Sequence, residues 1–236
     1  MTLFATSRLL SAAGVAHGFS LRAGGVSAGP FASLNLGGFV GDDPEAVREN
    51  SRRLEEAAGL AAGIATANQV HGDRVVDAQG REILAPTEPQ PDGADAVLGL
   101  GEQAVGVRVA DCVPVLIFAE DEGAAAAVHS GWRGTRLSIA ARGVRALQHA
   151  TGADPSRMLA AVGPSIGRCC YQVSAELASL FRAPRTLRGR VRIDMPQSLA
   201  RTVFIPALPR LLAAHPQLEV QLGTTDRRVD VIREGF

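Results

Sequence analysis

The residues of this 236-residue chain best suited to chemistry are a cysteine and a histidine that follow each other closely. Cys112 lies between two apolar runs at 105–109 and 113–118, and His129 closes a third run at 124–128. Such runs predict buried strands, and buried strands end where polar side chains begin. The sequence therefore predicts a thiol and an imidazole at neighbouring strand ends, which is half of a site for a soft metal.

Both residues also have a structural interpretation. A free cysteine between apolar runs is commonly a small buried hydrophobe, and a histidine at a strand end is commonly structural or solvated. The spacing does not match a compact zinc motif such as Cys-x-x-Cys. A third candidate favours the metal site, because His71 ends a further predicted strand at 64–70, directly after the amides of Asn68 and Gln69.

Two glycine-rich loops lie upstream. Arg22 stands at the entrance of the first, where Gly24 and Gly25 let backbone amides approach a ligand. A plain hairpin loop with a solvated arginine explains these residues equally well. In the second loop, Asn35 either points into a site or caps the turn.

The remaining helices and loops are predicted from apolar spacing and from the positions of glycine and proline. Asp43 and Pro44 predict a helix start, Gly59 predicts the end of that helix, and the prolines within 77–93 predict a loop. An amphipathic helix is predicted at 135–150, preceded by Trp132 and Arg133, with its N-terminus available to an anion. Its apolar face is expected to hold Leu137, Ala141, Val144 and Leu147, with the arginines opposite.

Composition limits the partners and the compartment. The formal net charge is zero, so the sequence argues against a nucleic-acid partner. No apolar run approaches membrane-spanning length, and the first 13 residues lack the features of a secretory signal. Three cysteines do not form a disulfide framework. We therefore expect a cytoplasmic protein with reduced thiols and no membrane partner, in an oligomeric state that the sequence leaves open.

The segments around these residues resemble the laccase-domain family, formerly described as multicopper polyphenol oxidases and now as purine nucleoside phosphorylases or peptidoglycan editing factors. Six segments carry the resemblance, over roughly residues 1–181. They are His-Gly-Phe and Arg-Ala-Gly-Gly-Val-Ser (17–19 and 22–27), Ser-Leu-Asn-Leu-Gly (33–37), Asn-Gln-Val-His-Gly (68–72), Ala-Asp-Cys-Val-Pro-Val (110–115), His-Ser-Gly-Trp-Arg-Gly-Thr (129–135), and Gly-Pro-Ser-Ile-Gly with Cys-Tyr (163–167 and 170–171). The resemblance implies an α+β fold of four layers, α/β/β/α, with mixed sheets. It also implies zinc, or alternatively copper, held by His71, Cys112 and His129.

The same resemblance implies zinc-dependent phosphorolysis of purine nucleosides such as adenosine, inosine and methylthioadenosine, with adenosine deamination as a second activity. The partners would then be a nucleoside and phosphate. Two imidazoles and a thiolate leave zinc one open position, as in catalytic sites. We expect Arg22 and Arg133 to bind phosphate and Asp111 to orient a ligand. The candidates for hydrogen bonds to sugar or base are Asn35, Asn68 and Gln69.

Three other functions remain open at this point. Hydrolysis of wrongly built peptidoglycan precursors cannot be separated from phosphorolysis by any single residue. Copper-dependent polyphenol oxidation needs many more histidines than the five present. A non-catalytic module that binds a small effector belongs to a different class and depends on the C-terminal residues.

Those C-terminal residues depart from the family. Residues 186–236 resemble the opening of a LysR-type regulator's effector-binding domain, without that regulator's winged helix. We therefore expect a laccase-like zinc-binding enzyme domain at 1–185 and an atypical LysR-like fragment at 186–236, built as strand, helix, strand and short helix. A fragment of about 50 residues rarely sustains a core alone. If it packs on the first domain, it is expected to bury Val191, Ile193, Leu208, Leu211, Leu212, Val220 and Leu222.

Overall fold

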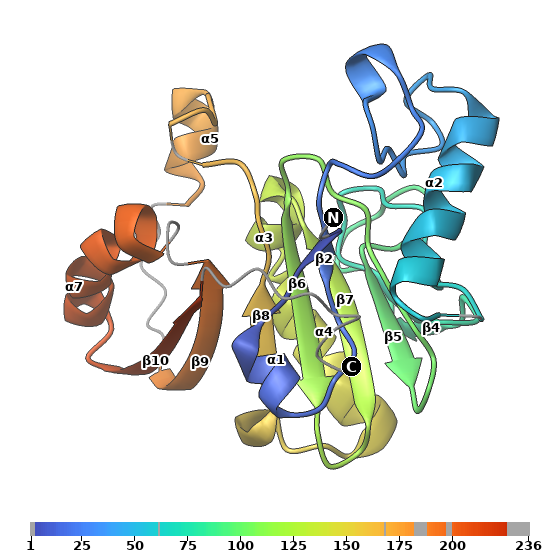
Figure 1. The fold of residues 1–236 in the computed structure, drawn as a ribbon. Coiled ribbons are helices and arrows are strands. Elements are labelled where there is room, and N and C mark those ends of the chain that lie inside the picture. The colour runs from blue at the N-terminus through green and yellow to red at the C-terminus, as the bar shows by residue number, and fades with distance from the viewer. Residues whose placement is uncertain (1–2, 61, 168, 182–187, 197–199, 226–236) are drawn as a thin grey trace.

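The computed structural model describes residues 3–60, 62–167, 169–181, 188–196 and 200–225. These residues form an eight-stranded mixed sheet and a two-stranded sheet, with helices on both faces of the larger one (Figure 1). The expected class, α+β with mixed sheets, is confirmed. Within the described ranges the smaller sheet consists of β1 (Phe4–Ala5) and β2 (Phe19–Ser20).

The large sheet brings the segments around Cys112 and His129 to the same end of its central strands. Its strands, in spatial order, are β10 (Gln217–Thr225), β9 (Arg188–Pro196), β8 (Leu159–Val162), β6 (Val113–Ala119), β7 (Ala124–Ser130), β5 (Ala96–Leu100), β3 (Val75–Asp77) and β4 (Glu82–Leu84). Strands β6 and β7 are antiparallel, and Val113 pairs with Ser130. The start of β6 and the end of β7 therefore lie side by side, as the sequence predicts.

The helices vary in length and position. They are α1 (Arg8–Ala12), α2 (Pro44–Ala57), α3 (Trp132–Arg136), α4 (Ile139–Thr151), α5 (Ala175–Ser179) and α7 (Ile205–Ala214), with short turns η1 (Gly29–Phe31), η2 (Pro155–Arg157) and η3 (Ala200–Phe204). Helix α2 begins as predicted, because the Asp43 side chain accepts a hydrogen bond from the amide of Glu45 at 3.0 Å. Gly59 follows its end with a φ of +68°. In the part of the chain that is described, no helix has the length and hydropathy to span a bilayer.

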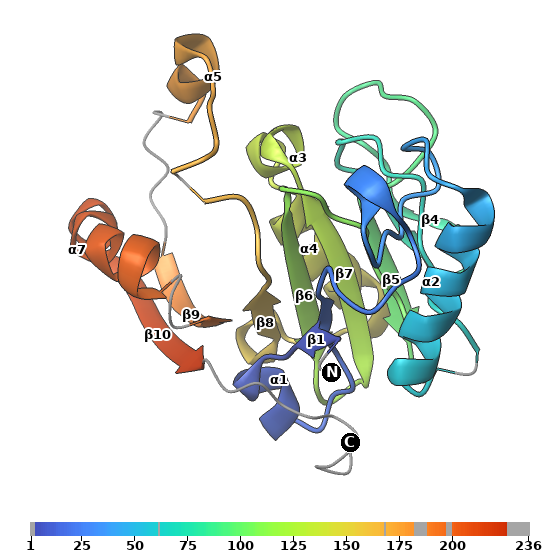
Figure 2. The ribbon, with the colours of Figure 1, turned by 45° about the horizontal axis from the view of Figure 1, so that its top comes forward.

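Alternation along β6 explains why helices cover both sheet faces. Ile117 is buried in the larger core with residues of β5, β7 and α4, including Leu98, Val128 and Leu147. The neighbouring Leu116 and Phe118 point the other way and pack with α1 and β8 in a second cluster. Side chains of a strand alternate between faces, so one apolar run lines both cores. Figure 2 shows α4 and α1 on opposite sides of the sheet.

Two predicted strands, at 64–70 and 105–109, are wrong. These residues form loops joined by a single bridge between Ala65 and Val105. Their apolar side chains are partly buried against β3 and β5, with Ala67 and Val105 packing near Val76 and Val97. Burial, not strand pairing, produces the apolar pattern.

The predicted loop at 77–93 and helix at 135–150 also need correction. Strand β4 lies within the former and pairs with β3. The helix breaks at Ser138, whose φ is +64°, so α3 and α4 are separate. Ala141 is exposed, whereas Arg142 is 8% exposed and forms part of the buried face. The Nε of Arg142 donates to the Asp73 carbonyl at 2.7 Å and lies 3.3 Å from the Asp73 carboxylate, which explains how an arginine is buried there.

The C-terminal residues extend the large sheet. Strand β9 runs parallel to β8, where Ala160 pairs with Ile193, and β10 runs parallel to β9. The predicted order of strand, helix and strand is present as β9, α7 and β10, while the predicted short helix lies outside the described residues. Val191 is 39% exposed. The other six side chains expected to be buried are only partly buried: Ile193, Leu208, Leu211, Leu212, Val220 and Leu222.

We propose that residues 186–236 complete the fold of residues 1–185, and truncation tests this. Removing every residue after Phe181 should lower the melting temperature by at least about 3 °C, because β8 loses its parallel neighbour and becomes an edge. A chain ending at Thr225 keeps β10 and serves as the control. Thermal unfolding followed by circular dichroism measures both, and equal melting of all three chains would mark the segment as an appendage.

Candidate functional site

Three predicted ligands meet at the end of the sheet where β6 begins and β7 ends. The ligand atoms of His71, Cys112 and His129 all lie within 4.8 Å of one another. The two imidazole rings meet edge to face, with centroids 4.8 Å apart. His129 is buried, Cys112 is partly buried and His71 is exposed, so the cluster opens to solvent on one side.

Asp95 holds this cluster together, and the sequence alone did not single it out. Its carboxylate is fully buried and accepts hydrogen bonds from the amides of Val70, His71 and Gly72 at 3.2, 3.0 and 2.7 Å. It also accepts a hydrogen bond from Nδ1 of His129 at 2.6 Å. The proton on Nδ1 leaves Nε2 of His129 as the free lone pair, which is the usual arrangement behind a metal-bound histidine.

The protonation of the cluster is set by burial and charge. Burial alone would raise the pKa of Asp95, but hydrogen bonds from His129 and from the backbone hold that pKa below its usual value. Burial, with the carboxylates of Asp111 and Asp95, raises the pKa of the Cys112 thiol. The thiol therefore keeps its proton at neutral pH unless a cation binds it.

The backbone at the cluster departs from ordinary conformations. His71 has a φ of +60° and Asp111 a φ of +77°, a region that side-chain-bearing residues rarely adopt. Gly131 lies against the ligands, because a Cβ there would come within 3.0 Å of the His71 ring and 3.2 Å of the Cys112 sulfur. A side chain at 131 would therefore crowd both ligands, which would have to move by a few tenths of an ångström.

The predicted anion and substrate residues are distributed differently. Arg133 lies on α3, two residues after Gly131, and is exposed. Asp111 is exposed beside Cys112, and its carbonyl accepts a hydrogen bond from the Ile166 amide at 2.9 Å. Their predicted roles toward phosphate and substrate stay predictions.

Four other predicted residues engage in hydrogen bonds within the protein. Arg22 donates from Nε to the Ala32 carbonyl, and Asn35 caps its own turn by accepting from the Gly37 amide at 3.0 Å. Hydrogen bonds from Ser27 and from Asn35 to the Asp42 carboxylate lower the pKa of Asp42. The structural interpretation of Asn35 is therefore the one observed.

The amides before His71 also contact backbone. Gln69 donates to the Arg108 carbonyl at 2.7 Å and accepts from the Arg108 amide at 2.8 Å. Asn68 donates to the Asp92 carbonyl at 3.5 Å. Gln69 thus fastens the segment before His71 to the segment before Cys112.

A buried asparagine unites the two upstream loops and was missed in the sequence. Asn50, on α2, accepts from the Val26 amide at 2.7 Å and donates to Ser27 Oγ and to the Asn35 carbonyl, each at 2.8 Å. The signal that could reveal it is an amide on the apolar face of an otherwise regular helix. These loops lie at the same end of the sheet as α3 (Figures 1 and 2).

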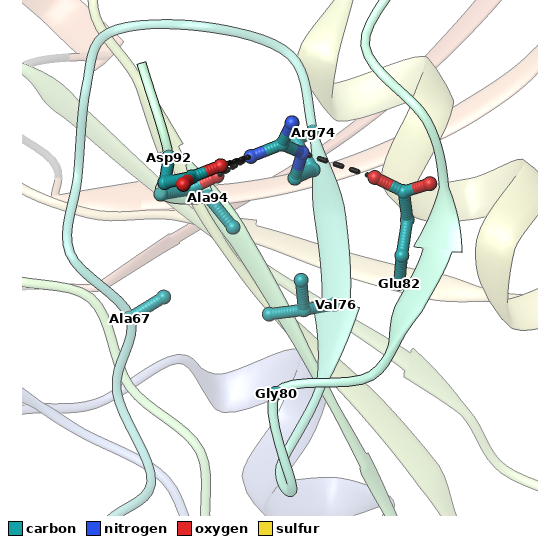
Figure 3. A pocket seen from close by; sticks show the side chains of 8 residues that line it. Ala67, Arg74, Val76, Gly80, Glu82, Asp92 and Ala94 are labelled. Atoms are coloured by element: carbon teal, nitrogen blue, oxygen red, sulfur yellow. Dashed lines mark hydrogen bonds and ion pairs between the residues drawn. The ribbon is translucent and has the colours of Figure 1, made fainter.

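A separate open hollow of about 390 Å³ is lined by residues of the segments 67–82 and 92–94 (Figure 3). Arg74 spans it, with Nε 3.0 Å from Glu82 and Nη1 3.5 Å from Asp92. Its apolar floor includes Ala67 and Val76. None of the three candidate ligands lines it, so it is distinct from the cluster.

Fold and site together define an α+β protein with a His-Cys-His cluster at one end of two central strands, suited to a metal ion. Comparison with known proteins is consistent with this class. The chain belongs to the family described as multi-copper polyphenol oxidoreductase laccase, whose model matches residues 16–203. Residues 184–236 are also similar to the LysR substrate binding domain.

The relatives are named for nucleoside chemistry. A purine nucleoside phosphorylase of Streptomyces coelicolor is 39% identical over 222 residues, covering 91% of this chain and 83% of its own. One of Corynebacterium glutamicum is 33% identical over 232 residues, covering 91% and 92%. A crystal structure of a Neisseria meningitidis protein has a TM-score of 0.62 at 30% identity, covering 92% of this chain and 84% of that one.

Asp95→Asn tests the supporting carboxylate. Replacing an oxygen acceptor by an amide donor removes the hydrogen bond that orients His129, so affinity for zinc should fall about 10- to 100-fold. Asp92→Asn is the matched control, because Asp92 is fully exposed on the neighbouring loop and should leave zinc affinity unchanged. Competition titration with a chelating dye measures both, and equal affinities would remove Asp95 from the site.

Proposed function

We propose that this chain is a zinc-dependent purine nucleoside phosphorylase acting on adenosine, inosine and methylthioadenosine. The observation that carries the proposal is the convergence of His71, Cys112 and His129 within 4.8 Å, backed by the buried Asp95. The names of the relatives support nucleoside phosphorolysis in general. Adenosine deamination as a second activity and the identity of the metal belong to the same proposal.

Zinc fits the donor set better than a copper centre. Two imidazole nitrogens and one thiolate make a three-ligand zinc site with a position left for water or substrate. Only two of the chain's five histidines take part, and His17 instead accepts a hydrogen bond from the Ser7 amide at 2.8 Å. Polyphenol oxidation by several coppers would need more imidazoles than this end of the sheet supplies.

The residues around the cluster suit a reaction with an anion. When bound, the metal would supply a Lewis acid for the substrate and lower the pKa of a coordinated water. The exposed guanidinium of Arg133 would bind phosphate and hold its charge while a phosphate oxygen attacks the ribose carbon. As that bond forms, the bond from ribose to the purine nitrogen breaks, and the departing base takes a proton. Asp111 would orient the substrate beside Cys112.

The hydrogen bonds within the loops reduce the number of residues that we propose to contact substrate. Asn35 and Gln69 form hydrogen bonds within their loops, so we propose that they shape the site and do not touch the sugar or base. Arg22 retains guanidinium donors beyond those used on the Ala32 and Pro30 carbonyls, and remains a second phosphate candidate. Asn68, which is exposed, remains a candidate for substrate contact.

Metal content is the first test. The purified protein should carry about one zinc per chain, and His71→Ala and Cys112→Ala should each lose most of it. His149→Ala is the matched control, because His149 lies in the last turn of α4 and is exposed. Elemental analysis by mass spectrometry measures all four proteins. Unchanged zinc in Cys112→Ala would exclude that thiol as a ligand.

Product analysis is the second test. Adenosine with phosphate should give adenine and ribose 1-phosphate, and Arg133→Ala should lower kcat/KM about 100-fold, chiefly through phosphate. Arg136→Ala, on the same short helix and also exposed, should change kcat/KM little.

Chromatography of the reaction separates the alternative functions. Inosine as the sole product would make deamination the main activity. Oxidation of a phenol would favour copper, hydrolysis of a peptidoglycan precursor would favour the editing role, and binding of a small effector without turnover would favour the module. Each of these results, without phosphorolysis, contradicts the proposal.

A further inference from the structure

Two adjacent cysteines lie on the loop that packs against the start of β6. Cys169 and Cys170 are both exposed, and their sulfurs lie 3.1 Å apart. The amides of Cys170 and Tyr171 both donate to the Gly167 carbonyl, at 3.0 and 3.1 Å, which forms a tight turn around the pair. The proposed phosphorolysis uses neither thiol.

The loop that precedes this pair is hydrogen-bonded to the backbone on either side of Cys112, at Asp111 and at Pro114. The Gly163 amide donates to the Pro114 carbonyl at 2.9 Å, and the Ile166 amide donates to the Asp111 carbonyl at 2.9 Å. Asp111 already has a φ of +77°, so its conformation depends on such contacts. Ile166, three residues before Cys169, is therefore bonded directly to the residue that precedes Cys112.

We propose that Cys169 and Cys170 form a reversible thiol-disulfide switch, oxidised to a vicinal disulfide by a small disulfide such as oxidised glutathione. In the first step the thiolate of one cysteine attacks the small disulfide, forms a mixed disulfide and releases one glutathione thiolate. In the second step the neighbouring cysteine attacks the mixed disulfide and releases the second glutathione. The protein loses two electrons and two protons, and one oxidised glutathione becomes two reduced molecules.

The roles of the two sulfurs are not fixed. Contact with Cys169 raises the pKa of Cys170, so Cys170 tends to keep its proton. Both sulfurs are exposed, so either can attack the small disulfide first and the other then resolves the mixed disulfide.

Ring strain makes the switch reversible. Adjacent Cα atoms are about 3.8 Å apart, whereas disulfides usually join Cα atoms roughly 4.4–6.8 Å apart. A disulfide between neighbours must therefore distort the turn at 167–171, and strained, exposed disulfides are the readily reduced ones. The same distortion is what would reach Asp111 and Cys112.

Peptide mapping tests the bond in the full-length protein. Trypsin cleaves after Arg168 and Arg182, so one peptide holds both thiols, while Cys112 lies in the separate peptide 109–133. After treatment with oxidised glutathione, the 169–182 peptide should lose the mass of two hydrogens and resist alkylation until a reductant is added. Cys170→Ser should instead retain glutathione on Cys169. Stable glutathione adducts on the wild-type peptide, or two thiols that remain free, would overturn the proposal.

Alkylation of Cys112 tests the coupling without relying on turnover. Oxidation should change the rate at which iodoacetamide labels Cys112 in the protein as purified by at least about threefold. The double variant Cys169→Ser with Cys170→Ser cannot form the bond, so the same oxidant should leave its rate unchanged. An equal response in both proteins, or no response in either, would contradict a link between the pair and the cluster. Because labelling needs no substrate, failure of phosphorolysis would leave this result intact.

Discussion

The geometry of the site depends on one buried carboxylate. Asp95 directly precedes β5 and accepts hydrogen bonds from three successive amides of the segment 70–72, and from His129 at the end of β7. A carboxylate with no exposure is costly unless its oxygens are satisfied. Four donors satisfy it, and the same four bonds fix where His71 and His129 stand. The same hydrogen bonds therefore both position the ligands and compensate the buried charge of Asp95.

This dependence explains why the sequence predicts the ligands better than their support. Cys112 and His129 sit at the ends of two continuous apolar runs, and strand pairing brings those ends together. Asp95 looks like an ordinary loop residue in a stretch of aspartates and glycines, because its partners are backbone amides 23 to 25 residues away. Only the folded chain reveals which of the several aspartates is buried.

The errors in predicted secondary structure have a related cause. Residues 64–70 and 105–109 are apolar enough for strands, yet their backbones meet only at Ala65 and Val105. Beyond that bridge the Gln69 side chain replaces backbone pairing. It hydrogen-bonds to both the carbonyl and the amide of Arg108, as the backbone of a neighbouring strand would. A side-chain amide that imitates a backbone leaves no periodic signal. The same limit applies at Ser138, where a positive φ interrupts a helix whose apolar spacing continues.

The site at the ends of the segments 64–70 and 105–109 depends on these segments being loops and not regular strands. A regular strand that continued through residue 71 or 111 would not allow the positive φ of His71 or Asp111. The loops instead turn at the end of the sheet, and each unusual conformation is held by a hydrogen bond from outside its own segment. His71 is held through its amide by Asp95, and Asp111 through its carbonyl by Ile166. Asp95 is fully buried in the core, whereas Ile166 is a partly buried residue of a loop that leads to the exposed cysteine pair. The thiol side of the cluster is therefore the side on which conformational change can act, while the imidazole side is fixed by the fold.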